Sequence, residues 1–359
     1  MLRAVCGEPA ELDATWMTQA LEEAGVARGA TITHLEFAGF VGTGQMARNA
    51  RFRLTWDRPE ERPGSVVGKF PSADSTARAT GFEQGSYITE WEFYSKVVNT
   101  LTIRTPRCYV ARFDEAAQEF VLIMEDMAGS RQGDQLAGLT VDEAALAVDT
   151  VVGLHAPRWG DPELRNFVAH RPKGDEWAGM LGGIYEMTSE PMLARLGNRL
   201  DPDVVSLIES FKPYAGKWAQ GVDTPRTLVH IDYRPDNFMF GVEPGAPPLA
   251  VVDWQTATDG NALIDVAYCL GACMPPATRA AVEQDMIKSY VSGMQAAGVN
   301  LDYDRAWRDY RHASLWGLAM AVIATILAAE TERGNDMLTR MAQYHGRHAL
   351  DLDALSLLR

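Results

Sequence analysis

Cysteine is scarce in this chain of 359 residues, which contains four. Cys6, Cys108, Cys269 and Cys273 are too few for the disulfide framework of a small secreted domain. Cys269 and Cys273 lie four positions apart in an apolar stretch, and we expect them to be buried thiols in a reducing compartment. The seven histidines show no zinc-ligand spacing with these cysteines.

Long apolar runs are also absent. The most membrane-like stretch, residues 313–329, is rich in alanine and falls short of the roughly 20 residues that span a bilayer. It therefore predicts a buried core helix. Residues 1–8 contain no apolar core of a signal peptide. We expect a cytoplasmic protein with no membrane partner.

Basic residues are outnumbered, with 33 Lys and Arg against 48 Asp and Glu and a net charge of −15. Nucleic acid is an unsuitable partner for such a chain because phosphate binding requires a basic face. The acidity could favour a cationic substrate, although solubility is the simpler explanation. With 47% hydrophobic and 23% charged residues, the composition is that of a globular protein long enough for two lobes.

The most informative stretch is Leu-Val-His-Ile-Asp-Tyr-Arg-Pro-Asp-Asn-Phe-Met-Phe, residues 228–240. Its apolar ends predict two short strands around a polar loop that contains His230, Asp232, Arg234, Asp236 and Asn237. A further apolar strand, Leu-Ala-Val-Val at 249–252, precedes Asp253. Asp232, Asn237 and Asp253 would together suit Mg²⁺ and phosphate, because hard cations prefer carboxylate and amide oxygen. An ordinary hairpin with a polar tip is the alternative.

The loop resembles the kinase catalytic loop H-R-D-L-x-x-x-N, and more closely the H-x-D-x-x-x-x-N loop of the aminoglycoside phosphotransferase and choline kinase superfamily. Asp253, in Val-Val-Asp-Trp-Gln, stands where these families carry their second metal-binding aspartate. The resemblance implies ATP and Mg²⁺ as cofactors, with Asn237 and Asp253 as metal ligands. It also implies that Asp232 accepts the proton of a substrate hydroxyl.

Two other loop residues receive roles from the same resemblance. Arg234 stands two positions after Asp232, where many kinases place a phosphate-contacting lysine, so it could steady the transferred group or simply pair with Asp236. His230 is expected to support the loop by hydrogen bonding. Two departures from the family pattern are Ile231, which replaces a small or basic residue, and Trp254-Gln255, which replaces Phe-Gly.

A glycine-rich turn precedes these motifs. Gly42, Thr43 and Gly44 separate the predicted strands 32–40 and 50–56, and in kinase-like folds such a turn covers the nucleotide phosphates. An ordinary hairpin turn is the alternative, because the glycine spacing differs from that of kinases.

Lys69 lies in the predicted strand 65–70, and the predicted helix 83–98 follows it. The kinase pattern makes Lys69 a phosphate ligand paired with a glutamate of that helix. We assign Glu90 as its partner, with Glu92 as the rival. The apolar strand 120–126 would end at the hinge, where Glu125 marks the nucleotide-binding segment.

The resemblance implies an α+β, two-lobed, protein-kinase-like fold. Residues 1–127 would form a small antiparallel β lobe, and residues 128–359 a larger, mostly helical lobe. Helical patterns occur at 11–23, at 140–155 after a capping box, and from 201 onward, whereas 160–200 appears irregular. Asp265 either braces the catalytic loop, as in the family, or caps the helix that it begins. His155 is interpreted as structural.

The function implied is an ATP-dependent phosphotransferase that phosphorylates a hydroxyl group of a small molecule. A protein kinase is disfavoured, because residues 253–265 leave no room for an activation loop. A nucleotide-binding pseudokinase that acts as an interaction module is the alternative. The sequence leaves open the acceptor, the choice between ATP and GTP, and whether the protein is a monomer or a homodimer.

Overall fold

The computed structural model describes residues 5–42, 46–167, 173–326 and 330–359. Contacts divide the described chain into two compact units. The N-terminal unit draws on residues 1–100, 104–131 and 241–257, and the C-terminal unit on 101–103, 132–240 and 258–359. The segment 241–257 therefore groups with the N-terminal unit, whereas the sequence analysis placed all of 128–359 in one lobe. The fold is a mixture of an antiparallel sheet and many helices, as predicted.

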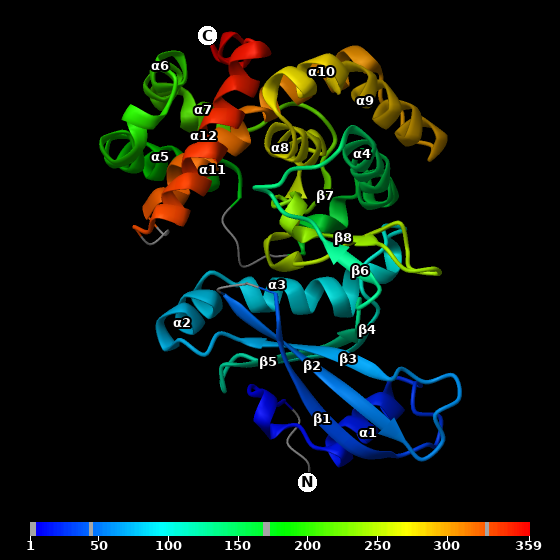
Figure 1. Ribbon diagram of the computed structural model, residues 1–359. Helices are drawn as coiled ribbons and strands as arrows, with labels where there is room; N and C mark the ends of the chain where they lie inside the picture. The colour runs from blue at the N-terminus through cyan, green and yellow to red at the C-terminus, as the bar shows by residue number, and fades with distance from the viewer. Residues whose placement is uncertain (1–4, 43–45, 168–172, 327–329) are drawn as a thin grey trace. The chain divides into compact units, whose positions relative to one another are not determined.

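The N-terminal unit is built on a five-stranded antiparallel sheet with the strand order β1-β2-β3-β5-β4. Its strands are β1 (Ile32–Val41), β2 (Ala47–Trp56), β3 (Ser65–Pro71), β4 (Cys108–Asp114) and β5 (Glu119–Glu125). Figure 1 shows α1 (Ala14–Glu23) on one side of this sheet and α3 (Ser86–Glu92) on the other. Residues alternate between the faces of a strand, so buried Phe52 and Phe70 join the α1 core while Lys69 points to the opposite face.

Two predicted helices in this unit begin later than expected. The first begins at Ala14 because Asp13 caps it, with Oδ1 accepting from the Trp16 N–H at 2.7 Å. The helix predicted from residue 83 is two helices, since Glu83 ends α2 (Ser75–Glu83) and α3 begins at Ser86. Gly85 separates them in a left-handed conformation, φ +69°, which interrupts helical hydrogen bonding.

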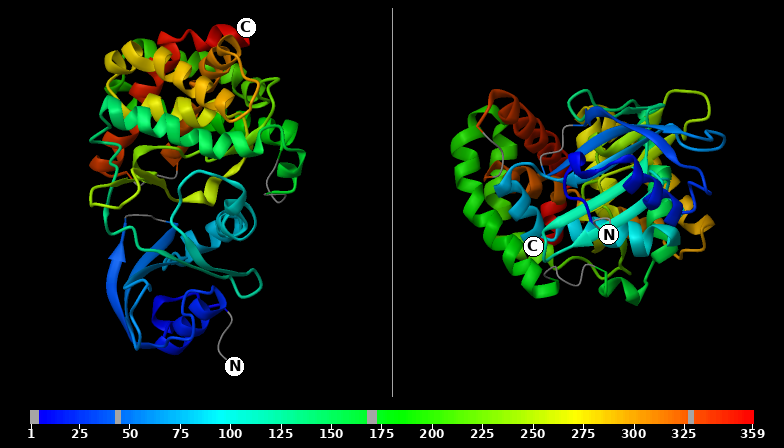
Figure 2. Two further views of the ribbon diagram at one scale, coloured as in Figure 1. Left: turned by 90° about the vertical axis from the view of Figure 1, so that its right-hand side faces the viewer. Right: turned by 90° about the horizontal axis from the view of Figure 1, so that it is seen from below.

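The C-terminal unit is mostly helical. Its helices are α4 (Val141–His155), α5 (Gly174–Leu196), α6 (Pro202–Phe211), α7 (Ala215–Ala219), α8 (Leu263–Cys273), α9 (Pro276–Ala296), α10 (Tyr303–Ala313), α11 (Leu315–Ile323) and α12 (Glu332–Asp351). The expectation of an irregular 160–200 was wrong, because α5 fills much of that stretch despite Pro191 within it. Figures 1 and 2 show α5 beside α11 and α12, and the three share one apolar core.

The capping box at the start of α4 is confirmed. Thr140 Oγ1 accepts from the Glu143 N–H at 3.2 Å, and Glu143 accepts from the Thr140 N–H at 2.9 Å. The apolar stretch at 313–329 gives the short helix α11 and a 3₁₀ turn (Ala324–Ile326), while residues 327–329 lie outside the described chain. Within the described residues, none of the helices is long and apolar enough to cross a membrane.

Short strands frame the loop singled out in the sequence. β7 (Thr227–Val229) pairs antiparallel with β10 (Thr258–Gly260) within the C-terminal unit, and the 230–237 loop follows β7 directly. β6 (Ser130–Gln132) and β8 (Phe238–Gly241) lie where the chain passes between the units, and β9 (Leu249–Val251) leads to Asp253. The predicted strands on both sides of the loop are therefore present.

A buried histidine fixes the close packing of α8, α11 and α12. The imidazole of His345, on α12, is fully buried and stacks on the Tyr268 ring with a centroid distance of 5.2 Å and an interplanar angle of 11°. It also lies against Gly271 of α8 and Gly317 of α11, where a Cβ atom would collide with the ring. Glycine at these two positions is what lets three helices approach one imidazole.

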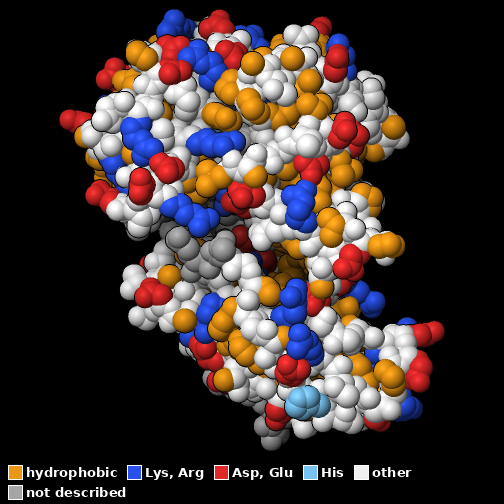
Figure 3. Space-filling model, in the orientation of Figure 1, with side chains coloured by type: hydrophobic (Ala, Val, Ile, Leu, Met, Phe, Trp, Pro, Cys, Tyr) orange, Lys and Arg blue, Asp and Glu red, His pale blue; other side chains and the backbone are white. Residues whose placement is uncertain are grey.

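The surface of the helical unit mixes both signs of charge. Figure 3 shows acidic and basic side chains interspersed on the visible face of this unit. The acidic excess of the sequence is therefore not concentrated on that face.

Candidate active site

A buried ion pair joins β3 to α3 in the N-terminal unit. Lys69 Nζ lies 2.6 Å from Glu90 Oε2 and 2.8 Å from Asp253 Oδ1. The Lys69 and Glu90 side chains are 7% and 2% exposed, while that of Asp253 is 31% exposed. The predicted pairing of Lys69 with Glu90 is confirmed, and Glu92 instead pairs with Lys96 at 2.8 Å.

The electrostatics of this cluster keep the lysine charged. Burial lowers the pKa of Lys69, but the carboxylates of Asp253 and Glu90 outweigh burial and raise it above its usual value. Burial raises the pKa of Glu90, and the ammonium of Lys69 opposes that rise. A charged lysine is thus held between a buried carboxylate and a partly exposed one.

The packing of Trp254 fixes the position of Asp253, the residue before it. Its ring stacks on Phe93 with centroids 4.0 Å apart and an interplanar angle of 6°, and its backbone N–H donates to Glu90 Oε1 at 3.3 Å. Asp253 adopts a left-handed conformation, φ +67°. The Trp254 that replaces Phe in the family pattern therefore serves as a packed anchor for Asp253.

The other residues predicted to bind the nucleotide are placed as follows. Gly42 ends the described part of the glycine-rich turn with φ +77°, and Thr43 and Gly44 lie outside the described residues. Glu125, at the end of β5, accepts from Arg104 Nη2 through both oxygens at 2.7 Å and from the Arg107 N–H at 2.9 Å. Its carboxylate is therefore engaged by neighbouring protein groups.

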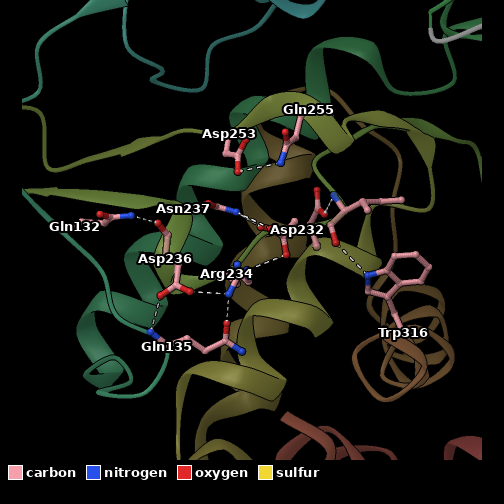
Figure 4. A network of polar contacts seen from close by, with 11 residues as sticks. Gln132, Gln135, Asp232, Arg234, Asp236, Asn237, Asp253, Gln255 and Trp316 are labelled. Atoms are coloured by element: carbon pink, nitrogen blue, oxygen red, sulfur yellow. Dashed lines mark hydrogen bonds and ion pairs between the residues drawn. The ribbon is translucent and has the colours of Figure 1, made fainter. Parts of the chain in front are cut away.

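In the C-terminal unit, Asp232 and Asn237 contact each other within the 230–237 loop. Asn237 Nδ2 donates to the Asp232 carbonyl at 2.8 Å and to Asp232 Oδ2 at 2.9 Å. Arg234 Nε lies 2.9 Å from Asp232 Oδ1 (Figure 4). The Asp232 side chain remains 28% exposed, so its carboxylate is oriented on two sides but still accessible.

Arg234 is held by more than Asp232. Its Nη1 donates to Asp236 Oδ2 and to Gln135 Oε1, both at 2.6 Å, and the Gln135 N–H donates to Asp236 Oδ1 at 2.9 Å (Figure 4). Burial lowers the pKa of Arg234, but Asp232, Tyr268 and Asp236 raise it beyond its usual value. The alternative that Arg234 pairs with Asp236 is confirmed, and a contact with phosphate stays a prediction.

Asp265 supports the 230–237 loop through backbone hydrogen bonds, as the family resemblance implied. Its fully buried carboxylate accepts from the backbone N–H groups of His230 and Ile231, both at 2.7 Å. His155 Nε2 lies 3.2 Å from the same carboxylate, and His155 Nδ1 lies 2.9 Å from the Tyr290 hydroxyl. The structural interpretation of His155 is therefore confirmed, and Asp265 acts on the loop and does not cap a helix.

Three residues of this site were not found from the sequence. Gln135 holds Arg234, Tyr268 is buried near Asp232, whose charge helps burial to raise the pKa of the tyrosine hydroxyl, and Trp316 Nε1 donates to the Ile231 carbonyl at 3.0 Å. Tyr268 follows Asp265 by three positions and so shares its helix face, a spacing that could have indicated it. Trp316 is 84 positions beyond Asp232, and only tertiary structure brings it to the loop.

Asn237 in the C-terminal unit and Asp253 in the N-terminal unit each offer the type of oxygen atom that hard cations prefer. With Nδ2 of Asn237 committed to Asp232, the amide oxygen of Asn237 is the atom that a cation would use. Asp253 offers a partly exposed carboxylate. Mg²⁺ is usually held by one or two carboxylates together with substrate phosphates. Among the described residues, no cluster of three or more His, Cys, Asp or Glu could hold a metal ion by itself.

These features define a protein of the protein-kinase-like phosphotransferase class. The sequence profile of the phosphotransferase enzyme family matches residues 45–299, and the chain belongs to this family. Over 66 residues, 17% of the chain, it is 46% identical to acyl-CoA dehydrogenase family member 10 of Mus musculus. That match spans only 6% of the mouse protein.

Solved structures of the same fold include a putative aminoglycoside phosphotransferase from Ralstonia eutropha JMP134, with a TM-score of 0.51 and 19% identity over 93% of this chain and 98% of that one. The ethanolamine kinase of Plasmodium vivax gives a TM-score of 0.55 and 12% identity over 96% of this chain and 90% of that one. Aminoglycoside 2′-phosphotransferase-IIIa gives a TM-score of 0.53 and 15% identity over 91% of this chain and 98% of that one. At these identities, the similarity concerns the fold.

Proposed function

We propose that this protein is an ATP-dependent kinase that transfers the γ-phosphoryl group of ATP to a hydroxyl group of a small molecule. The observation that carries the proposal is the oriented, accessible carboxylate of Asp232, fixed by Asn237 and Arg234 on a loop braced by Asp265. Phosphoryl transfer depends mainly on positioning and on neutralising charge, and these contacts support the positioning of Asp232.

In the proposed reaction, Asp232 accepts a hydrogen bond from the acceptor hydroxyl. The hydroxyl oxygen forms a bond to the γ-phosphorus while the bond to the β–γ bridging oxygen breaks, and the proton passes to Asp232. The products are ADP and a phosphate ester. Arg234 would stabilise negative charge on the transferred group, although its contacts to Asp232 and Asp236 restrict how far it can move. His230 would keep the loop in place through its backbone contact to Asp265.

The N-terminal unit would hold the nucleotide. Lys69, kept charged by its two carboxylate partners, would contact the phosphates, and Glu90 would orient it. Gly42, Thr43 and Gly44 would cover the phosphates through backbone N–H groups, and the chain at Glu125 would offer backbone groups to the base. Asn237 and Asp253 would hold Mg²⁺, which when bound neutralises phosphate charge.

The solved relatives support nucleotide use and a small acceptor. Aminoglycoside 2′-phosphotransferase-IIIa was solved with GDP, and APH(2″)-IIIa with GDP and kanamycin. Because these structures carry a guanine nucleotide, ATP and GTP both belong in the assay. The acceptor assigned to this chain is a small hydroxylated molecule.

The test is ADP or GDP formation by the purified chain with Mg²⁺ and a panel of aminoglycosides, amino alcohols, sugars and hydroxy acids. On the best acceptor, Asp232→Asn should lower turnover by roughly 10²–10⁴-fold, the usual contribution of a general base. Nucleotide affinity should change little. Nucleotide binding without turnover on any acceptor would contradict the proposal and favour the pseudokinase alternative.

A further inference from the structure

Ile231, the residue before Asp232, has an unusual backbone conformation. Its φ is +69°, in the left-handed region that β-branched residues rarely adopt. The conformation costs an L-residue about 1–2 kcal/mol, whereas glycine adopts it freely. Strain of this kind is found mostly at functional sites, where the surrounding structure enforces it.

Two contacts to main-chain atoms of Ile231 hold it in this conformation. The Ile231 N–H donates to Asp265 Oδ1 at 2.7 Å, and its carbonyl accepts from Trp316 Nε1 at 3.0 Å. Figure 4 shows the Trp316 indole directed at the loop that carries Asp232. Neither contact uses the isoleucine side chain. Glycine would make both contacts without the conformational cost, so the choice of isoleucine has to be explained by its side chain.

That side chain lies at the margin of a core. Ile231 is partly buried and packs against the apolar cluster that includes Trp316, Leu315 and Leu318. It is not fully covered, and it is adjacent in sequence to the accessible carboxylate of Asp232. The strained backbone therefore carries a partly exposed aliphatic group next to the proposed general base.

Both carboxylates of the loop are already paired within the protein. The loop contains two carboxylates, those of Asp232 and Asp236, and Arg234 lies 2.9 Å from the first and 2.6 Å from the second. Gln135 holds the guanidinium in place between them. A polycationic acceptor would need further carboxylates, and this loop supplies none beyond the base and its paired neighbour.

We propose that Ile231 determines acceptor specificity, and that the acceptor is an alcohol with an aliphatic segment next to the hydroxyl that is phosphorylated. Polycationic amino sugars and cationic amino alcohols are then poor acceptors. The proposal rests on the kinase function proposed above. It adds the chemical class of the acceptor and names Ile231 as the residue that selects this class.

The experiment measures nucleoside diphosphate formation by the full chain with Mg·ATP and two sets of acceptors. One set is a series of straight-chain hydroxy acids and alkanols of increasing length, and the other is kanamycin, ethanolamine and choline. In the first set, kcat/KM should rise by up to about fourfold for each methylene that becomes buried. The second set should be turned over more slowly than the best member of the first.

Two variants test the residue itself. Ile231→Gly and Ile231→Asn both suit the left-handed conformation but lack the aliphatic side chain. Each should reduce the ratio of kcat/KM between the longest and shortest acceptors to near one. Because a general loss of activity cancels in this ratio, the readout separates specificity from loop damage. As a matched control, Val205→Ala removes apolar contact with the same core from α6 and should leave the ratio unchanged.

The possible failures are distinguishable. Faster turnover of kanamycin, ethanolamine or choline than of every aliphatic alcohol would overturn the acceptor class and leave the kinase function standing. An unchanged length ratio in both Ile231 variants would overturn the role of this side chain. Absence of diphosphate formation with every member of both sets would contradict the kinase function itself.

Discussion

Lys69 Nζ lies 2.8 Å from Asp253 Oδ1, so a proposed phosphate ligand and a proposed metal ligand contact each other directly. Glu90 holds the same ammonium from the other side at 2.6 Å. Of the three side chains, only Asp253 is substantially exposed. Glu90 therefore anchors the lysine, and the Lys69–Asp253 contact is the part of the cluster that the proposed nucleotide would rearrange.

Substitution of Lys69 should affect both stability and nucleotide binding. Lys69→Met leaves Glu90 buried without its cation, and breaking a buried pair typically costs about 3–5 kcal/mol in the free energy of unfolding. Adding Glu90→Gln removes the stranded charge and should recover much of that loss. Nucleotide affinity should stay reduced in both variants, by roughly 10–100-fold, because the charged contact to phosphate is gone.

Denaturant unfolding and equilibrium nucleotide binding on the same samples measure the two effects. Lys96→Met is the matched control, since Lys96 is exposed and pairs with Glu92 at 2.8 Å. It should change neither quantity measurably. Recovery of nucleotide affinity in the double variant would show that Lys69 acts only through stability.

Asp253→Asn should separate the metal from the nucleotide. Asparagine tolerates the left-handed conformation of this position, so the fold should persist. Nucleotide affinity in Mg²⁺ should fall by roughly 10–100-fold, because a charged ligand becomes a neutral amide. Affinity in EDTA should change much less, since no metal ion is then present for the carboxylate to bind. A titration of nucleotide with and without Mg²⁺ checks this, and an equal loss under both conditions would contradict the role of Asp253.

Loss of the Asp265 brace should appear in turnover more than in nucleotide affinity. Asp265→Asn replaces one acceptor oxygen with an N–H₂ group that faces a backbone donor, so one of the His230 and Ile231 N–H groups loses its partner. An unsatisfied buried donor costs about 1–3 kcal/mol. We expect a lower melting temperature and a kcat reduced by at least about tenfold, with the nucleotide Kd unchanged. Asp259→Asn, which removes another ion-paired carboxylate of the same unit, should leave kcat intact.

His345 predicts a specific loss of stability in acid. Burial, with smaller contributions from His348 and Arg279, lowers the pKa of His345 from 6.5 to about 3. Below about pH 6.5, His345 therefore binds a proton in the unfolded chain but stays neutral in the folded chain. The free energy of unfolding consequently falls as the pH falls from 6.5 to 3. At pH 5 this group alone costs about 2 kcal/mol relative to neutral pH. His345→Phe should flatten the decline, as measured by denaturant unfolding at pH 7 and pH 5, and an identical pH dependence in the variant would contradict the assignment.

The parts of the fold that local sequence patterns specify were predictable. Local sequence patterns indicated β1, β2, β3 and β5 of the N-terminal sheet but not β4, and the Thr140 capping box marked the start of α4. The glutamate paired with Lys69 was predicted from the family resemblance, with Glu92 as a rival that faces another way on the helix. What failed was a stretch with weak periodicity, 160–200, whose helix α5 is stabilised by packing against α7 and α11.

The residues that support the site could not be predicted from the sequence as readily. Gln135 and Trp316 lie on segments distant in the chain from the 230–237 loop, and no local spacing relates them to it. The left-handed conformation of Ile231 was equally hidden, since the sequence indicated only that its type was unusual for the position. Residues that do the proposed chemistry occur in motifs, whereas those that hold them are brought together by tertiary folding.

The packing of His345 has a consequence for engineering. Replacement of helical glycine with alanine is a common route to thermostability, because alanine has the higher helix propensity. At Gly271 and Gly317 the added methyl group would meet the imidazole of His345 and force the helices apart. At Gly179 and Gly183, on the exposed side of α5, a methyl group would meet no atom within 4 Å. A stabilised variant of this protein should therefore replace glycine with alanine on α5 and keep Gly271 and Gly317 on α8 and α11.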